Sequence, residues 1–259
     1  MIHILLSRWR QGRRTLPYPR ELPALPERFR GRPEFDPGAC AGGCRACADA
    51  CPTGAIRLAG DGADRPSPRL DLGRCLFCTA CVDACPDGVL HFTGDHRLAT
   101  GRREELELGP GRELRLAEAM GAELRRVLGR SLQLRVVSAG GCNGCEVDVN
   151  VLGTLAWDLG RFGIQVVASP RHADGLVVCG PVTANMALAL RKTFDAMPDP
   201  KLVIAVGACA IAGGPYLHQD EQLGGAAGAG LPVDLFIPGC PPHPLTILDG
   251  LLRLVGRIQ

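Results

Sequence analysis

The stretch CLFCTACVDACP, residues 75–86, carries four cysteines separated by two, two and three residues, and a proline follows the last of them. Three thiols this close together on a short loop can surround a small iron–sulfur core, and the spacing is the bacterial run for a [4Fe–4S] cluster. When two such clusters are present, the fourth cysteine of each run ligates the other cluster. The stretch therefore predicts an iron–sulfur domain and implies a second run.

A second run is present in CAGGCRACADACP, residues 40–52, and Cys85 follows Cys51 by 34 residues. The two runs form an internal duplication, so we expect two [4Fe–4S] clusters that exchange their fourth ligands. The expected ligand sets are Cys40, Cys44, Cys47 and Cys85 for one cluster, and Cys75, Cys78, Cys81 and Cys51 for the other.

Alternatives remain for this duplicated region. Three residues separate Cys40 from Cys44, so a three-iron or labile cluster stays open there, although the small residues 41–43 also suit a bulged loop. Zinc is the weaker alternative, because zinc sites normally use two separated pairs and do not require eight duplicated ligands. Eight clustered cysteines also fit a secreted disulfide framework. Against that, the apolar run Ile2–Leu6 is too short for a secretory signal.

Composition limits the function classes further. The chain has 259 residues, of which 46% are hydrophobic, so two domains with packed cores are expected. The net charge of +2 does not favour nucleic-acid binding. No uninterrupted apolar stretch approaches the length of a membrane span. Clustered thiols without a secretory signal favour a cytosolic metalloprotein.

The first half of the chain divides into three segments. Residues 1–36 form an Arg- and Pro-rich arm that begins MIHILLSRW, which is either a short amphipathic turn at a membrane or partner surface or a frayed terminus. Residues 37–96 are expected to form an α+β ferredoxin-like 2[4Fe–4S] domain. Residues 97–132 form a linker with an amphipathic helix, because apolar residues recur there at helical spacing. These residues are Leu116, Met120, Leu124 and Val127.

Residues 133–259 alternate short apolar runs with helical segments. This alternation predicts an α/β domain with a mainly parallel sheet covered on both faces. The expected strands lie in LQLRVVSA, GIQVVAS, GLVVCG, KLVIAVGA and VDLFIPG. The expected helices span residues 147–159 and lie in ANMALALRKTFDAM and PLTILDGLLRLVGRI.

Four later cysteines follow predicted strands: Cys142 and Cys145 after the first, Cys209 after KLVIAV and Cys240 after VDLFIPG. The carboxyl ends of parallel strands build the sites of α/β sheets, so these thiols are expected to meet at one edge. Cys179 lies inside its strand and is expected to be a small buried hydrophobe. Glycines beside the four thiols allow close backbone approach. They are Gly140, Gly141, Gly144, Gly207 and Gly239.

The motifs CNGCEVDV, residues 142–149, and VDLFIPGCPPHP, residues 233–244, resemble a known family. It comprises the small subunit of membrane-bound energy-converting (group 4, formate hydrogenlyase-like) [NiFe] hydrogenases and the homologous 20-kDa-type subunit of complex I. The front portion, from FRGRPEFDPGAC at residues 29–40, resembles the two-cluster ferredoxin-type subunit of formate hydrogenlyase and related hydrogenases. The chain thus looks like a fusion of two subunits that are commonly separate.

The resemblance implies a flavodoxin-like fold for residues 133–259 and a third [4Fe–4S] cluster, hence three in all. The ligands it implies for this cluster are Cys142, Cys145, Cys209 and Cys240. Complex I relatives carry two adjacent cysteines at the first position, so the separation by Asn143 and Gly144 favours the hydrogenase side. Glu146 is either a proton-relay carboxylate or a carboxylate stabilised by a helix N-terminus. No catalytic residue is expected in this chain.

The resemblance further implies an electron-transfer subunit of a membrane-associated [NiFe] hydrogenase complex. The expected partners are a [NiFe]-type large subunit, other soluble-arm and membrane subunits, and a donor module such as a formate or CO dehydrogenase. The expected location is peripheral, on the cytoplasmic side of the cell membrane. The alternative is a complex I-like quinone-reducing subunit without hydrogenase activity.

Overall fold

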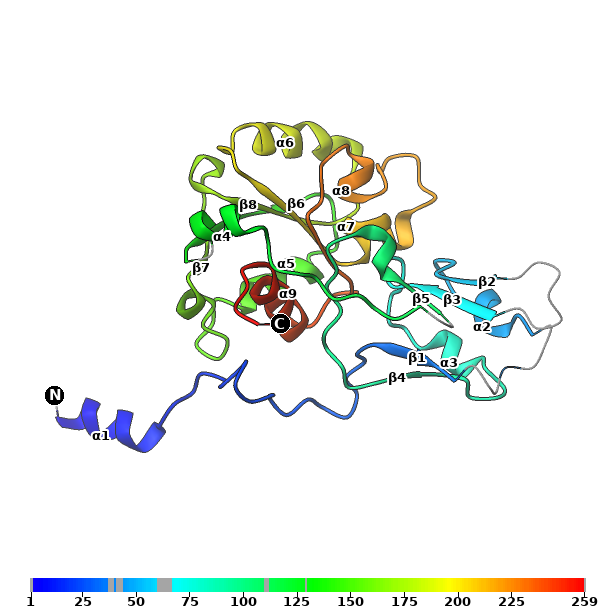
Figure 1. Ribbon diagram of the computed structural model, residues 1–259, viewed down its shortest axis with the longest axis horizontal. Helices are drawn as coiled ribbons and strands as arrows, with labels where there is room; N and C mark the ends of the chain where they lie inside the picture. The colour runs from blue at the N-terminus through cyan, green and yellow to red at the C-terminus, as the bar shows by residue number, and fades with distance from the viewer. Residues whose placement is uncertain are drawn as a thin grey trace.

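The computed structural model describes residues 2–36, 40, 44–59, 67–109, 112–128 and 130–258. Figure 1 shows a ferredoxin-type part built from short strands at one end of the molecule, beside a larger α/β part. The N-terminal helix α1 (Ile2–Gln11) projects away from both parts. The predicted order of an iron–sulfur domain followed by an α/β domain is confirmed.

The ferredoxin-type part contains two small antiparallel sheets. Strand β1 (Pro33–Phe35) pairs with β4 (Leu90–Phe92). The other sheet has the order β2-β3-β5, and its strands are β2 (Ile56–Ala59), β3 (Ser67–Asp71) and β5 (Glu107–Leu108). The short helices α2 (Ala46–Asp49) and α3 (Ala80–Asp83) carry the middle of each cysteine run. β1 comes from the expected arm and β5 from the expected linker, so the sheets extend on both sides of residues 37–96.

The α/β part is built on a five-stranded parallel sheet in the order β10-β9-β8-β6-β7. Counted from the start of this part, the order is 2-1-3-4-5. The strands β8, β9 and β10 are buried along their whole length, since helices cover both faces and their sequences are therefore continuously apolar. The five strands are β6 (Leu132–Ser138), β7 (Ile164–Val166), β8 (Gly175–Cys179), β9 (Leu202–Val206) and β10 (Leu235–Ile237).

Helices α5 (Gly144–Val151) and α9 (Pro244–Leu254) cover one face of the sheet, and α6 (Ala184–Asp195) and α7 (Ala208–Ala212) cover the other. The smaller α8 (Gly225–Gly228) packs on α7. Single turns of 3-10 helix complete the chain at η1 (Arg103–Leu106), η2 (Leu159–Phe162), η3 (Pro170–His172) and η4 (Gly214–Tyr216).

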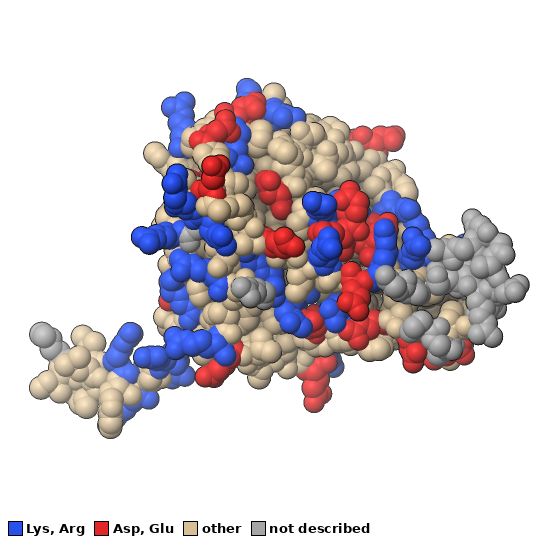
Figure 2. All heavy atoms as spheres, in the orientation of Figure 1, with Lys and Arg blue, Asp and Glu red and all other residues tan. Residues whose placement is uncertain are grey.

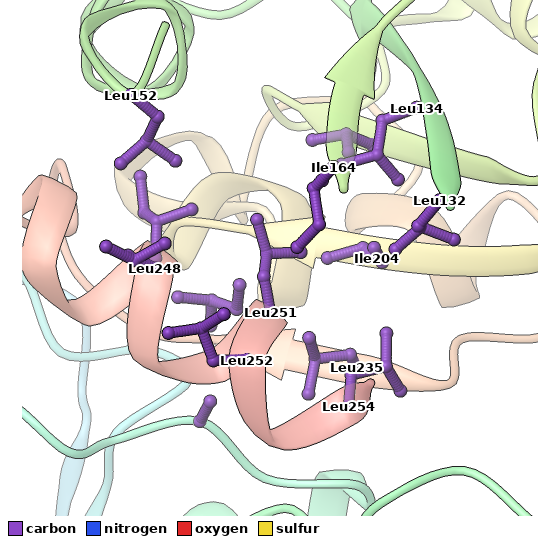
Figure 3. Packing of buried hydrophobic residues seen from close by; sticks show 14 of the residues in the cluster. Leu132, Leu134, Leu152, Ile164, Ile204, Leu235, Leu248, Leu251, Leu252 and Leu254 are labelled. Carbon is purple, nitrogen blue, oxygen red and sulfur yellow. The ribbon is translucent and has the colours of Figure 1, made fainter. Parts of the chain in front are cut away.

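Two hydrophobic cores flank the parallel sheet. In the first, Leu251 of α9 points toward Ile164 and Ile204 of the strands, and Leu248 lies opposite Leu152 at the end of α5 (Figure 3). The second covers the opposite face and continues from Leu176 to Leu70 in the ferredoxin-type part. Each such side chain contributes about 1.5–3 kcal/mol on burial. The shared core therefore joins the ferredoxin-type part to the α/β part.

Two predicted helices differ from the observed ones. The linker helix α4 spans only Ala122–Leu128, because backbone groups before it bond to other segments: the N–H of Ala117 donates to Ala99 O at 2.8 Å. The helix predicted over residues 147–159 instead begins at Gly144 and ends at Val151. It is shifted toward the cysteines, and turns replace its second half.

Candidate functional site

The eight cysteines of the two runs line two separate pockets in the ferredoxin-type part. The structure brings the fourth cysteine of each run together with the first three of the other, as the spacing predicts. One pocket is lined by Cys40, Cys44, Cys47 and Cys85. The other is lined by Cys51, Cys75, Cys78 and Cys81. The positions fit two exchanged ligand sets, and ligation itself stays a prediction.

In the second pocket Cys75 and Cys81 are buried, Cys51 is half-buried and Cys78 is exposed, and backbone N–H groups point at two of the sulfurs. Burial raises the pKa of the Cys75 thiol to about 12, and the neighbouring Cys81 adds to the rise. The N–H of Phe77 donates to Cys75 Sγ at 3.3 Å, and that of Ala55 to Cys51 Sγ at 3.2 Å. Such thiols ionise when a cation binds them, and N–H groups aimed at sulfur tune the potential of a cluster.

The third group of cysteines lies at the carboxyl edge of the parallel sheet. Cys145 is in the first turn of α5, Cys209 is in α7 after β9, and Cys240 follows β10. A Cβ added at Gly144 would lie 3.6 Å from Cys142 Sγ and 3.6 Å from Pro241, the residue after Cys240, so these two loops meet at one place. Burial raises the pKa of the Cys209 thiol to about 12, and Cys240 and Cys142 add to the rise. Cys142, which precedes α5, completes this group of four free cysteines. Cys209 is buried, whereas Cys142 and Cys240 are exposed. The site therefore opens toward the molecular surface.

Two glycines make room for these sulfurs. Gly207 has a φ of +89°, and a Cβ added there would lie 2.4 Å from Cys145 Sγ. Gly214 has a φ of +57°, and its Cβ would lie 2.6 Å from Cys209 Sγ. Bare backbone thus forms a cradle for the two sulfurs, which suits a cluster held by four thiolates. Gly214 was missed by the sequence analysis, and the adjacent glycine pair at residues 213–214 is the signal that could have identified it.

Two further groups lie behind this cradle. Cys179 ends β8 and is 0% exposed within the core, as expected for a small buried hydrophobe. Glu146 lies in the first turn of α5 and is 7% exposed. Its Oε1 atom is buried and has no hydrogen-bond partner among the described residues. This position agrees with a carboxylate at a helix N-terminus, and it leaves the proton-relay alternative open.

A cavity of about 410 Å³ separates the second-run cysteines from the α/β site, and Cys78 and Cys240 both line it. Although Cys240 is exposed at the rim of the cavity, partial desolvation there raises the pKa of its thiol, and Cys142 and Cys78 add to the rise. The pocket of the first-run set, by contrast, is lined by residues between 35 and 90. The second-run set is therefore the one placed beside the α/β site.

The arm contributes a residue to the same cavity. Arg30 lines it, and its Nη1 atom donates a hydrogen bond of 2.7 Å to the backbone oxygen of Phe77. Phe77 has a φ of +55° and precedes Cys78 directly, so this bond supports the cysteine loop in a strained conformation. The motif FRGR had no assigned role in the sequence, because a contact between the arm and this loop exists only in the folded chain.

Two protein families match this chain, one in each part. Residues 142–254 match the family described as NADH ubiquinone oxidoreductase, 20 Kd subunit. Residues 27–89 match the family described as 4Fe-4S dicluster domain.

Three relatives illustrate the range of similar proteins. A probable membrane-bound hydrogenase subunit of Pyrococcus furiosus is 40% identical over 137 residues, which cover 53% of this chain and 81% of the relative. Formate hydrogenlyase subunit 7 of Escherichia coli is 40% identical over 141 residues, covering 54% of this chain and 55% of the relative. An NADH-quinone oxidoreductase subunit of Bacteroides thetaiotaomicron is 44% identical over 116 residues, covering 44% of this chain and 58% of the relative.

Proposed function

Because the chain belongs to the family of NADH ubiquinone oxidoreductase 20-kDa subunits, we propose that it is an iron–sulfur electron-transfer subunit of a membrane-associated oxidoreductase complex. The 2-1-3-4-5 strand order, which is that of flavodoxin-like sheets, supports a flavodoxin-like assignment of the α/β part. The dicluster match supports a 2[4Fe–4S] assignment of the preceding part.

Three [4Fe–4S] clusters fit the donor sets of this chain. Two would be held by the exchanged sets of the ferredoxin-type part and the third by Cys142, Cys145, Cys209 and Cys240. When bound, the clusters supply one-electron transfer. The protein's own contribution is to hold the thiolates, to aim N–H groups such as that of Phe77 at them, and to exclude water from buried sulfurs such as that of Cys209.

The proximity of Cys78 and Cys240 carries the functional proposal. It supports a relay from the first-run set to the second-run set and then to the α/β site. The exposed Cys142 at the sheet edge would face the subunit that exchanges electrons with this chain. A donor or acceptor module would meet the ferredoxin-type part at the other end.

We infer that the complex is a [NiFe] hydrogenase. The separation of Cys142 from Cys145 supports this choice, as do two relatives, one named a membrane-bound hydrogenase subunit and the other formate hydrogenlyase subunit 7. The catalytic nickel–iron centre would lie on a large subunit, a formate or CO dehydrogenase would be a suitable donor, and the chain would lie on the cytoplasmic side of the membrane. Fusion of the two matched families in one chain would join two otherwise separate subunits.

The 44% identity to an NADH-quinone oxidoreductase subunit favours a second candidate, a complex I-like quinone-reducing subunit. The complex purified anaerobically with this chain distinguishes the two. If the complex is a hydrogenase, its large subunit should contain paired Cys-x-x-Cys nickel ligands, and the complex should reduce a dye with hydrogen. A complex that lacks both properties but reduces quinone would contradict the hydrogenase assignment. About twelve irons per chain are expected in either case, and zinc in their place would contradict both.

A further inference from the structure

Helix α1 presents an apolar face outside the body of the protein. Ile2, Leu5, Leu6 and Trp9 recur at helical spacing and are 70%, 67%, 43% and 81% exposed. Of the described residues in this helix, Ile2–Gln11, none is buried. An exposed apolar face of this kind, on a segment that projects from the molecule (Figure 1), indicates a binding surface for a membrane or for another protein.

The charge of the segment indicates what this apolar face binds. Arg8 and Arg10 lie in the last turn of α1, Arg13 and Arg14 follow it, and the sequence has no acidic residue before Glu21. In Figure 2 the described part of the projecting helix is tan and blue, with no red atoms. Basic residues around a narrow apolar face that contains tryptophan are typical of helices lying in the headgroup region of anionic membranes.

The arm that follows this helix is attached to the body. The N–H of Leu16 donates to Ala156 O at 2.8 Å, and the hydroxyl of Tyr18 donates to Asp249 Oδ1 at 2.9 Å. Only a few residues therefore separate α1 from a fixed attachment point. In the described part of the chain, we find no helix with the length and apolarity needed to cross a bilayer.

We propose that α1 binds the surface of an anionic phospholipid bilayer, with Leu5, Leu6 and Trp9 inserted and the arginines at the headgroups. Complementarity between the arginines and anionic lipid favours this occupant over a protein partner. The proposal goes beyond the electron-transfer function and uses none of its residues, so either can fail without the other.

The full chain, loaded with iron, is mixed with phosphatidylcholine vesicles that contain or lack phosphatidylglycerol. Trp9 is exposed and Trp157 is 9% exposed, so a blue shift of fluorescence in a Trp157→Phe background reports insertion of α1. We expect co-sedimentation and the blue shift with phosphatidylglycerol only, both reduced by high salt. Replacing Arg8 or Arg10 by Gln should weaken binding about fivefold each.

A matched pair of variants tests the face itself. Leu5→Glu should weaken binding at least about tenfold, whereas Ile4→Glu, on the other side of the helix and 71% exposed, should change it little. Iron content should be unchanged in both variants. Equal losses in the pair, or equal binding to both vesicle types, would overturn the proposal. The proposal would also be overturned if the wild-type chain did not bind vesicles and the Leu5→Glu variant no longer co-purified with the complex. The face would then bind another protein of that complex.

Discussion

Cys78 and Cys240 lie in different parts of the chain and line the same cavity. Two reduced clusters at these positions would be close neighbours, and neighbouring paramagnetic clusters broaden each other's EPR signals. We therefore expect the signal of the α/β cluster to be broadened in fully reduced protein. Cys51→Ser, which should remove the proposed second-run cluster, should sharpen it. Cys47→Ser, which should remove the proposed first-run cluster, should leave it broad, and the reverse pattern would contradict the proposed order of the relay.

The proposed exchange of ligands between the runs makes a second prediction. Cys85 shares a pocket with Cys47, not with Cys81. The double variant Cys47→Ser/Cys85→Ser should therefore lose a single cluster and retain about eight irons, whereas Cys81→Ser/Cys85→Ser should lose two clusters and retain about four. Iron analysis of both proteins after anaerobic reconstitution is the measurement. Retention of eight irons by the second variant would instead indicate that each run binds its own cluster.

Much of this site follows from local sequence. The spacing of each cysteine run and the position of Cys209 and Cys240 after apolar runs are local patterns, and strand ends meet at one edge in any parallel sheet. They predict which thiols come together without a structure.

Other features depend on how the two parts pack, which local patterns do not contain. β5 joins the ferredoxin-type sheet because Leu108 pairs with Leu70, although its segment is a linker by composition. The predicted helix around Met120 is replaced because the N–H of Met120 bonds to Leu254 O. The contact of Arg30 with Phe77 and the proximity of Cys78 to Cys240 arise in the same way.

The glycine cradle makes a third prediction. Gly207→Ala would place a Cβ 2.4 Å from Cys145 Sγ, so the α/β cluster should be lost and the iron content should fall from about twelve to about eight. Gly224→Ala is the matched control, because Gly224 also has a positive φ, +76°, but has no atom within 4 Å of the added Cβ. The control variant therefore has the backbone strain, about 1–2 kcal/mol, without any clash with a sulfur atom. It should keep all its iron, and equal loss in both variants would assign the effect to strain.

A fourth prediction separates the cysteine inside a strand from those at strand ends. Cys179 is fully buried in the core, and Cys209 lies in the cradle. Cys179→Ser should retain about twelve irons and lose stability, since a hydroxyl buried without a partner costs about 1–3 kcal/mol. Cys209→Ser should lose one cluster. Iron analysis with denaturant unfolding measures both effects, and equal iron loss would mean that Cys179 is a ligand.

The buried network that attaches the arm predicts a pH dependence of stability. His96 is 4% exposed and lies against Tyr18 and against Asp249, which accepts a 2.8 Å hydrogen bond from Arg253. Burial lowers the pKa of His96 below 6.5, and this outweighs the opposing effect of Asp249 and Asp95, while Arg97 and Arg253 lower it further. Near pH 7, above this pKa, His96 is therefore neutral in the folded protein.

The unfolded chain binds a proton at His96 as the pH falls through about 6.5, whereas the folded protein does so only at lower pH. The contribution of His96 to stability is thus complete above this pH and decreases below it. We expect the free energy of unfolding to fall between about pH 7.5 and 5.5. The fall should be smaller in His96→Gln and unchanged in His91→Gln, whose side chain is 57% exposed. Urea titrations across this range measure it, and a slope in His96→Gln equal to that of the wild type would exclude His96 as the source.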